Sequence, residues 1–112
     1  MPGFGNPFEG LNLDRPLTKE ELVRAVRFVI AAEYEAIQLY RQISLAANDE
    51  RASKVLDSVT QEEVVHAGEF LKLLTELDPN EAKLYQKGFQ EATDTMKLSV
   101  SNLIKKLANS LK

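Results

Sequence analysis

Hydrophobic residues recur at alternating steps of three and four positions along two long stretches of the chain. In the first stretch, residues 19–47, the repeating positions are Leu22, Val26, Val29, Glu33, Ala36, Tyr40, Ile43 and Ala47. In the second, residues 50–77, they are Leu56, Val59, Glu63, His66, Phe70, Leu73 and Leu77. This spacing is typical of an α-helix whose apolar face packs against a nearly antiparallel neighbour. We therefore predict two long helices of about 28 residues each.

Local signals mark the ends of both predicted helices. Thr18 followed by Glu21 matches the capping box of a helix start. Residues 48–49, Asn-Asp, break the repeat and cap the next helix. They leave only a short turn, so the second helix must fold back along the first. Residues 78–80, Asp-Pro-Asn, end the second helix. The resulting hairpin exposes an apolar flank, and we expect two hairpins to pair into a four-helix bundle.

The segments outside the hairpin are less regular. Residues 1–17 hold three of the five glycines and three of the four prolines, so this N-terminal arm either docks through its apolar residues or is disordered. A short third helix is expected to end near Met96. Residues 97–112 contain no acidic residue and carry an apolar stripe, but their serines argue against a rigid extension of that helix. We predict an all-α chain with a helical domain at residues 18–96 and a separate tail.

Composition narrows the possible functions. A chain of 112 residues forms one small domain with a limited core, which oligomerisation would supplement. A net charge of −3 gives no basic patch for nucleic acid. No apolar run approaches the roughly 20 residues of a membrane span, and no signal peptide is evident, so a cytoplasmic location is expected. The absence of cysteine excludes thiolate metal sites, including a rubredoxin-type iron centre.

Three polar residues stand in the apolar repeat and point to metal chemistry. A buried, unpaired carboxylate is costly, yet Glu33 and Glu63 both occupy repeat positions. His66, the only histidine, follows Glu63 by three residues and shares its helix face. A di-iron four-helix bundle uses one Glu from each of two helices and Glu-x-x-His from each of the other two. This chain supplies half of that set, so a two-fold dimer would enclose two iron ions, with manganese as the alternative metal.

Each of these residues also has a purely structural interpretation. A lone histidine on an apolar face is more often a hydrogen-bonded core residue, but its combination with two carboxylates favours metal ligation. Tyr40 lies two turns after Glu33 and either donates a hydrogen bond to a ligand or packs at the bundle edge. Glu35 stands off the apolar face and is either part of a second metal site or a solvated side chain.

Residues 14–95 resemble the encapsulated ferritins, the half-ferritins housed in encapsulin nanocompartments. The resemblance rests on residues 17–43 around Glu33, on the Glu-Glu-x-x-His of residues 62–66, and on the Asp-Pro that follows the second helix. Residues 98–106, LSVSNLIKK, resemble the cargo-loading peptides that dock on the inner wall of an encapsulin shell.

The resemblance implies a ferroxidase that oxidises Fe(II) at a di-iron site on a two-fold dimer interface and delivers ferric iron for storage inside the shell. It also implies assembly of the dimers into a decameric ring. The family's ligands match Glu33, Glu63 and His66, and a family tyrosine near the site matches Tyr40. A secondary metal site of the family uses carboxylates around Glu35, although some members have a second Glu where this chain has Ala32.

Two other functions remain open at this point. A rubrerythrin-like peroxide scavenger uses the same ligand types, but a chain without cysteine would need a partner to deliver electrons. A metal-free helical adaptor would use residues 97–112 as its binding element. That segment also has plainer interpretations, as an amphipathic helix covering an apolar groove or as a strap across a dimer.

Overall fold

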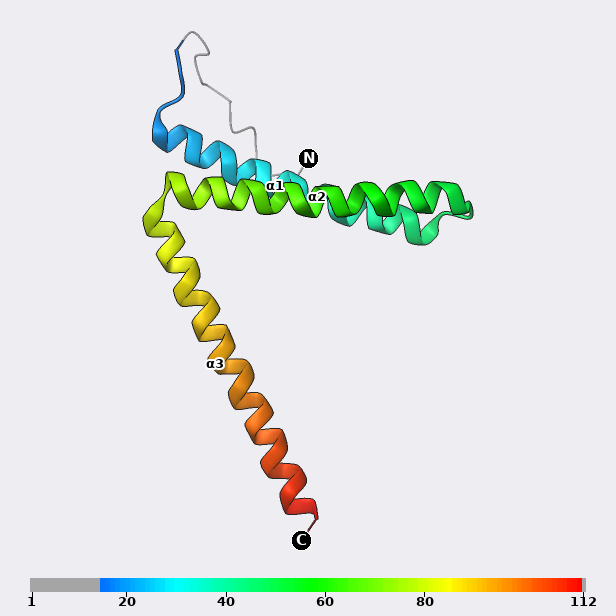
Figure 1. Cartoon of the computed structure of the whole chain (residues 1–112), viewed down its shortest axis with the longest axis vertical. Helices are drawn as coiled ribbons and strands as arrows, with labels where there is room; N and C mark the ends of the chain where they lie inside the picture. Colours follow the sequence, from blue (N-terminus) through cyan, green and yellow to red (C-terminus); the bar gives the residue numbers. More distant parts are fainter. Residues whose placement is uncertain (1–14, 112) are drawn as a thin grey trace. The chain divides into compact units, whose positions relative to one another are not determined.

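The computed structural model describes residues 15–111, and the side chains of all of these except residues 98–100. Within this range the chain forms three helices and no strand: α1 (Lys19–Ala46), α2 (Glu50–Leu77) and α3 (Pro79–Ser110). α1 and α2 lie side by side and antiparallel (Figure 1). The predicted all-α architecture, with two long antiparallel helices followed by a third, is confirmed. Most of the predicted N-terminal arm lies outside the described residues.

The start of α1 has the predicted capping box. The Thr18 hydroxyl accepts a hydrogen bond from the backbone N–H of Glu21 at 3.1 Å, and the Glu21 carboxylate accepts one from the backbone N–H of Thr18 at 2.9 Å. Both Nη atoms of Arg15 also donate to this carboxylate, at 2.7 and 3.1 Å. The Arg15 hydrogen bond is the main reason that the pKa of Glu21 is lowered to about 2. The first turn of α1 is therefore fixed by local contacts alone.

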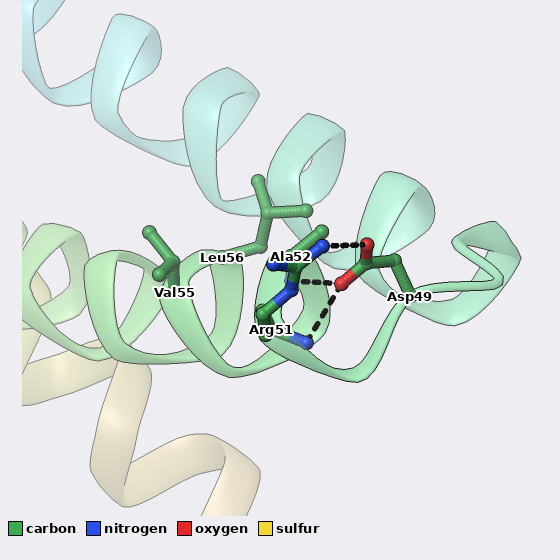
Figure 2. Close-up of a pocket in the computed structure, with 5 residues that line it drawn as sticks. All are labelled: Asp49, Arg51, Ala52, Val55 and Leu56. Atoms are coloured by element: carbon green, nitrogen blue, oxygen red, sulfur yellow. Dashed lines mark hydrogen bonds and ion pairs between the residues drawn. The ribbon is translucent and has the colours of Figure 1, made fainter.

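The turn between α1 and α2 ends at Asp49, which caps α2. One oxygen of its carboxylate accepts hydrogen bonds from the backbone N–H groups of Arg51 and Ala52, at 2.9 and 3.1 Å, and the other accepts from the Arg51 guanidinium at 3.1 Å (Figure 2). These three residues, with Val55 and Leu56, line a shallow depression at this end of the hairpin. The carboxylate satisfies helix N–H groups that would otherwise lack a partner, so this cap fixes where α2 begins.

The apolar core lies at the end of the hairpin where α1 begins and α2 ends. It consists of Val23, Val26 and Ile30 of α1 and Leu74 of α2, with Phe70, Leu71 and Leu77 packed against it. Three residues of the predicted packing faces are instead substantially exposed: Leu22 by 38%, Leu73 by 42% and Ile43 by 46%. A hydrophobic repeat at steps of three and four residues identifies the apolar face of a helix. It does not show which residues of that face pack within the hairpin and which remain exposed.

Replacement of Leu74 by alanine should lower the free energy of unfolding by about 3 kcal/mol. Leu74 is 1% exposed, so its truncation leaves a cavity in a small core. The matched control is Leu45→Ala on α1, because Leu45 is 71% exposed and its loss should change stability little. Denaturant unfolding followed by circular dichroism measures both variants. Equal midpoints for the two variants would contradict this description of the core.

α3 continues without interruption from Pro79 to Ser110, so the prediction of a short third helix ending near Met96 is wrong. Pro79 occupies the first position of the helix. A backbone N–H at this position makes no hydrogen bond within the helix, so its absence in proline costs nothing there. Gly88 and the later serines lower helix propensity by at most about 1 kcal/mol each, and no further proline follows to stop the helix. The assignment of residues 97–112 as a functional segment remains a prediction.

The hairpin, up to Asp78, and α3, from Pro79 onward, form two separate units. α3 presents large apolar side chains to solvent over both halves of its length: Leu84, Tyr85, Phe89, Met96, Leu103, Ile104 and Leu107. None of the described helices is long and apolar enough to cross a membrane. The three predicted metal ligands, Glu33, Glu63 and His66, lie in the hairpin unit.

Candidate metal centre

The hairpin brings three potential metal ligands together at the middle of its length. Glu33 is the fifteenth of the 28 residues of α1, and Glu63 is the fourteenth of the 28 residues of α2, so antiparallel packing sets them opposite each other. His66 follows one turn later on α2. One ligand atom from each of the three residues lies within 4.8 Å of those of the other two. Among residues 15–111 no other group of three His, Asp or Glu side chains meets this condition.

The three side chains differ in their exposure to solvent. The Oε2 atom of Glu33 is buried and has no hydrogen-bond partner within the described part of the chain. The side chain of Glu63 is 20% exposed, and that of His66 is 47% exposed, with Nδ1 3.8 Å from Oε2 of Glu63. A buried carboxylate oxygen without a partner carries an uncompensated desolvation cost. A bound cation would provide the missing partner.

The electrostatics of the group also favour a cation. A hydrogen bond with Glu63 raises the pKa of Glu33, burial and the Glu63 charge raise it further, and the charge of His66 acts in the opposite direction. Two carboxylates at this distance therefore do not both ionise readily. A divalent ion between them would reverse this effect, because it stabilises the charged forms of both carboxylates.

The ligand face continues along the hairpin as an exposed apolar surface. At 100° per residue, Leu22 lies within about 20° of Glu33 around α1, three turns away. Leu73 lies within about 20° of His66 around α2, two turns away. Both leucines are exposed, as is His66. An isolated hairpin thus leaves His66 and apolar side chains uncovered on one side, which is typical of a surface that binds a partner.

The other two predicted site residues are not part of this group of three. Tyr40 is half-buried on α1. Glu35 is half-buried, and its Oε2 atom is enclosed. It stands about 200° around α1 from Glu33, since each residue turns the helix by 100°. A hydrogen bond from Tyr40 to a ligand and a second metal site at Glu35 remain predictions.

A cluster of polar side chains between the metal centre and the turn was missed by the sequence analysis. Ser44 of α1 is only 7% exposed, and its hydroxyl donates to the Asp57 carboxylate at 2.6 Å. The Ser53 hydroxyl donates to the backbone oxygen of Ser44 at 3.0 Å, and Arg41 binds Asp57 at 3.2 Å. The sequence does contain a pattern that points to Ser44. It continues a series at seven-residue spacing that begins with three apolar residues, Val23, Ile30 and Ile37. A serine in that series marks a polar contact on the face of α1 that packs on α2.

Comparison with known proteins identifies relatives of this chain. The sequence model of the rubrerythrin family matches residues 25–110. The chain is 43% identical over 84 residues to a ferritin-like–encapsulin shell fusion protein of Pyrococcus furiosus, covering 75% of this chain and 24% of the relative. It is 42% identical over 77 residues to the encapsulin nanocompartment cargo protein EncC of Myxococcus xanthus, covering 69% and 58%. The chain thus spans only about a quarter and somewhat over half of the lengths of these relatives.

A solved structure shows the same fold. The crystal structure of the encapsulated ferritin domain from Pyrococcus furiosus superposes with a TM-score of 0.72 at 40% sequence identity. The alignment covers 82% of this chain and 94% of that domain. Together with the family match, this extent and identity show that the chain belongs to the encapsulated ferritins, ferritin-like proteins of the rubrerythrin family.

Proposed function

We propose that this protein is a ferroxidase that binds Fe(II) through Glu33, Glu63 and His66 and transfers the electrons to dioxygen or peroxide. The observation that carries the proposal is the meeting of three ligand atoms within 4.8 Å around a buried carboxylate oxygen without a partner. Carboxylate oxygens with one imidazole form a donor set suited to iron or manganese. Membership of a di-iron family supports iron.

The site is completed by a second copy of the chain across a two-fold axis. One hairpin offers two carboxylates and one imidazole, which is half of the ligand set of a di-iron bundle. Two hairpins together offer four carboxylates, whose charge balances two ferrous ions. The exposed apolar residues Leu22 and Leu73, on the same helix faces as the ligands, provide contacts for the second hairpin. We propose that these dimers assemble further into a ring.

Each residue has a distinct part in this proposal. Glu33, whose Oε2 atom is buried, would bind the metal as a carboxylate. Glu63 would supply a second carboxylate to bound iron, and His66 would supply a ring nitrogen. Tyr40 donates a hydrogen bond to a ligand carboxylate in the completed bundle. A pair of Fe(II) ions supplies its electrons together, so the protein needs no nucleophile or general base.

The proposal places the protein inside an encapsulin nanocompartment. One relative is named as a fusion of a ferritin-like part to an encapsulin shell, and another as an encapsulin cargo protein. In this chain, residues 98–106 would dock on the shell. Leu103 and Ile104 in this segment are 57% and 60% exposed and are available for such a contact. The ferric product would then accumulate in the shell lumen.

An anaerobic titration with Fe(II), followed by native mass spectrometry, tests the site and its stoichiometry together. We expect one iron per chain, bound to dimers or multiples of dimers, because a single hairpin holds half of the ligands. Iron bound with the same affinity to a monomer would contradict the shared site. Protein that takes up no iron would instead support the metal-free adaptor.

The match to the rubrerythrin family supports one alternative, a peroxide-scavenging di-iron protein. The chain contains no cysteine that could hold an electron-delivering iron centre, so a separate reductant would be required. Comparing the rates of Fe(II) oxidation by dioxygen and by hydrogen peroxide separates the two functions. Sustained peroxide turnover with an external reductant, without accumulation of ferric iron, would favour the scavenger.

A further inference from the structure

We infer that Ser44, together with Ser53 and Asp57, is a positioning group that sets the register of α1 against α2 at the metal centre. This inference rests on the proposed function, since it concerns how the ligands Glu33, Glu63 and His66 are held. None of the three positioning residues belongs to the ligand group.

The cluster links the two helices in both directions. The Ser44 hydroxyl of α1 donates to the Asp57 carboxylate of α2 at 2.6 Å, while the Ser53 hydroxyl of α2 donates to the backbone oxygen of Ser44 at 3.0 Å. The first of these is short because its acceptor is charged. Both have directional requirements that apolar contacts lack, so together they resist sliding and rotation of one helix against the other.

The polar cluster of Ser44, Ser53 and Asp57 matters because the buried apolar residues of the hairpin lie mainly on the other side of the ligands. On one side of the ligands the helices are held by Val23, Val26, Ile30 and Leu74. On the other side, between Glu33 and the end of α1, the only buried residue is Ser44, and α2 has no buried residue before Ala67. In the turn-side half of the described hairpin, Ser44 is therefore the one buried residue, and its contacts with Ser53 and Asp57 join the two helices there.

Register matters here because the ligands come from both helices. Ser44 lies three turns beyond Glu33, about 16 Å along the axis, and Asp57 lies about 9 Å before Glu63. A slip of one residue moves a helix by about 1.5 Å, whereas metal–ligand distances must hold to within about 0.2 Å. The covalent turn limits how far the helix ends separate but leaves small sliding and rotation to side-chain contacts.

Removal of the Ser44 hydroxyl should disturb this register without unfolding the protein. Asp57 is 45% exposed and keeps its ion pair with Arg41, so its charge would not become buried and unpaired. The matched control is Thr60→Val, which removes a hydroxyl that lies closer to the ligands. Thr60 bonds only to the backbone oxygen of Leu56 in its own helix, at 2.7 Å, so it does not link α1 to α2.

The experiment titrates the 112-residue chain with Co(II), whose visible absorption bands report ligand geometry. We expect Ser44→Ala to weaken Co(II) binding several-fold and to change the shape of the bands, because the register of the two helices sets the ligand geometry. Ser53→Ala should act in the same direction. Thr60→Val should keep the wild-type affinity and spectrum. Ile30→Val, in the core, serves as a stability control with a lowered unfolding midpoint but an unchanged spectrum.

The possible results distinguish failure of the positioning role from failure of the proposed metal site. If the wild type binds Co(II) and Ser44→Ala binds it with the same affinity and spectrum, the positioning role is wrong while the metal site stands. The role is also wrong if Ile30→Val changes the spectrum as Ser44→Ala does, because loss of stability alone would then explain the effect. If the wild type itself binds no Co(II) or Fe(II), the proposed function falls, and the positioning role falls with it.

Discussion

Replacing His66 by alanine is expected to abolish Fe(II) oxidation, lowering the rate by more than about 100-fold, because loss of a residue that merely supports a ligand already costs 10- to 100-fold. In a two-fold dimer each substitution counts twice, so His66→Ala removes one imidazole from each iron. Glu63→Ala should have an effect of the same size, since its carboxylate lies within 4.8 Å of the other two ligands.

The measurement follows the appearance of ferric iron under air at equal protein concentration. Glu62→Ala is the matched control, because Glu62 adjoins Glu63 on α2 but is exposed and outside the ligand group. The control should oxidise Fe(II) at the wild-type rate. If His66→Ala or Glu63→Ala were as fast as the wild type, the assignment of this metal centre would be refuted, and circular dichroism would show whether the helices had remained intact.

Deletion of residues 97–112 is expected to eliminate co-purification with a co-expressed encapsulin shell while leaving Fe(II) oxidation unchanged. The two effects separate because α3 and the hairpin are distinct units, and the three ligands lie in the hairpin. The apolar side chains of the segment, including Leu103, Ile104 and Leu107, are more than half exposed and available for docking.

A matched pair of point substitutions tests the same idea without truncation. Ile104→Asp places a charge in the apolar stripe and should prevent encapsulation. Asn109→Asp adds the same charge at an exposed polar position of α3 and should not. Unchanged co-purification after the deletion, or equal losses for both point variants, would show that this segment does not direct docking.

The parts of the fold that were predicted correctly depend on local contacts. The capping box of Thr18 and Glu21 and the cap at Asp49 each involve residues at most three positions apart, so the sequence contains all that determines them. The end of the third helix was not predicted correctly. Gly88 and the serines weaken a helix, but weakening does not stop it in the absence of proline or a specific cap.

The candidate metal centre could be predicted from the sequence because charged residues in an apolar repeat are rare and require an explanation. Periodicity alone brought Glu33, Glu63 and His66 together, and the structure places them in one group. The hydrophobic repeat did not reveal that the Oε2 atom of Glu33 is buried while the His66 side chain is half exposed. Those differences depend on how the two helices are rotated against each other. The contacts of Ser44 were missed for the same reason, as they join residues of different helices.

The placement of the ligands at the midpoints of two helices of equal length has a consequence for protein design. A second hairpin turned by half a revolution about an axis through those midpoints overlaps the first along its whole length, with no overhang at either end. Two tandem copies of the hairpin in one polypeptide could therefore form the complete bundle without moving a ligand along its helix. Such a duplicated chain would allow one half of the site to be altered independently of the other, which a symmetric dimer does not permit.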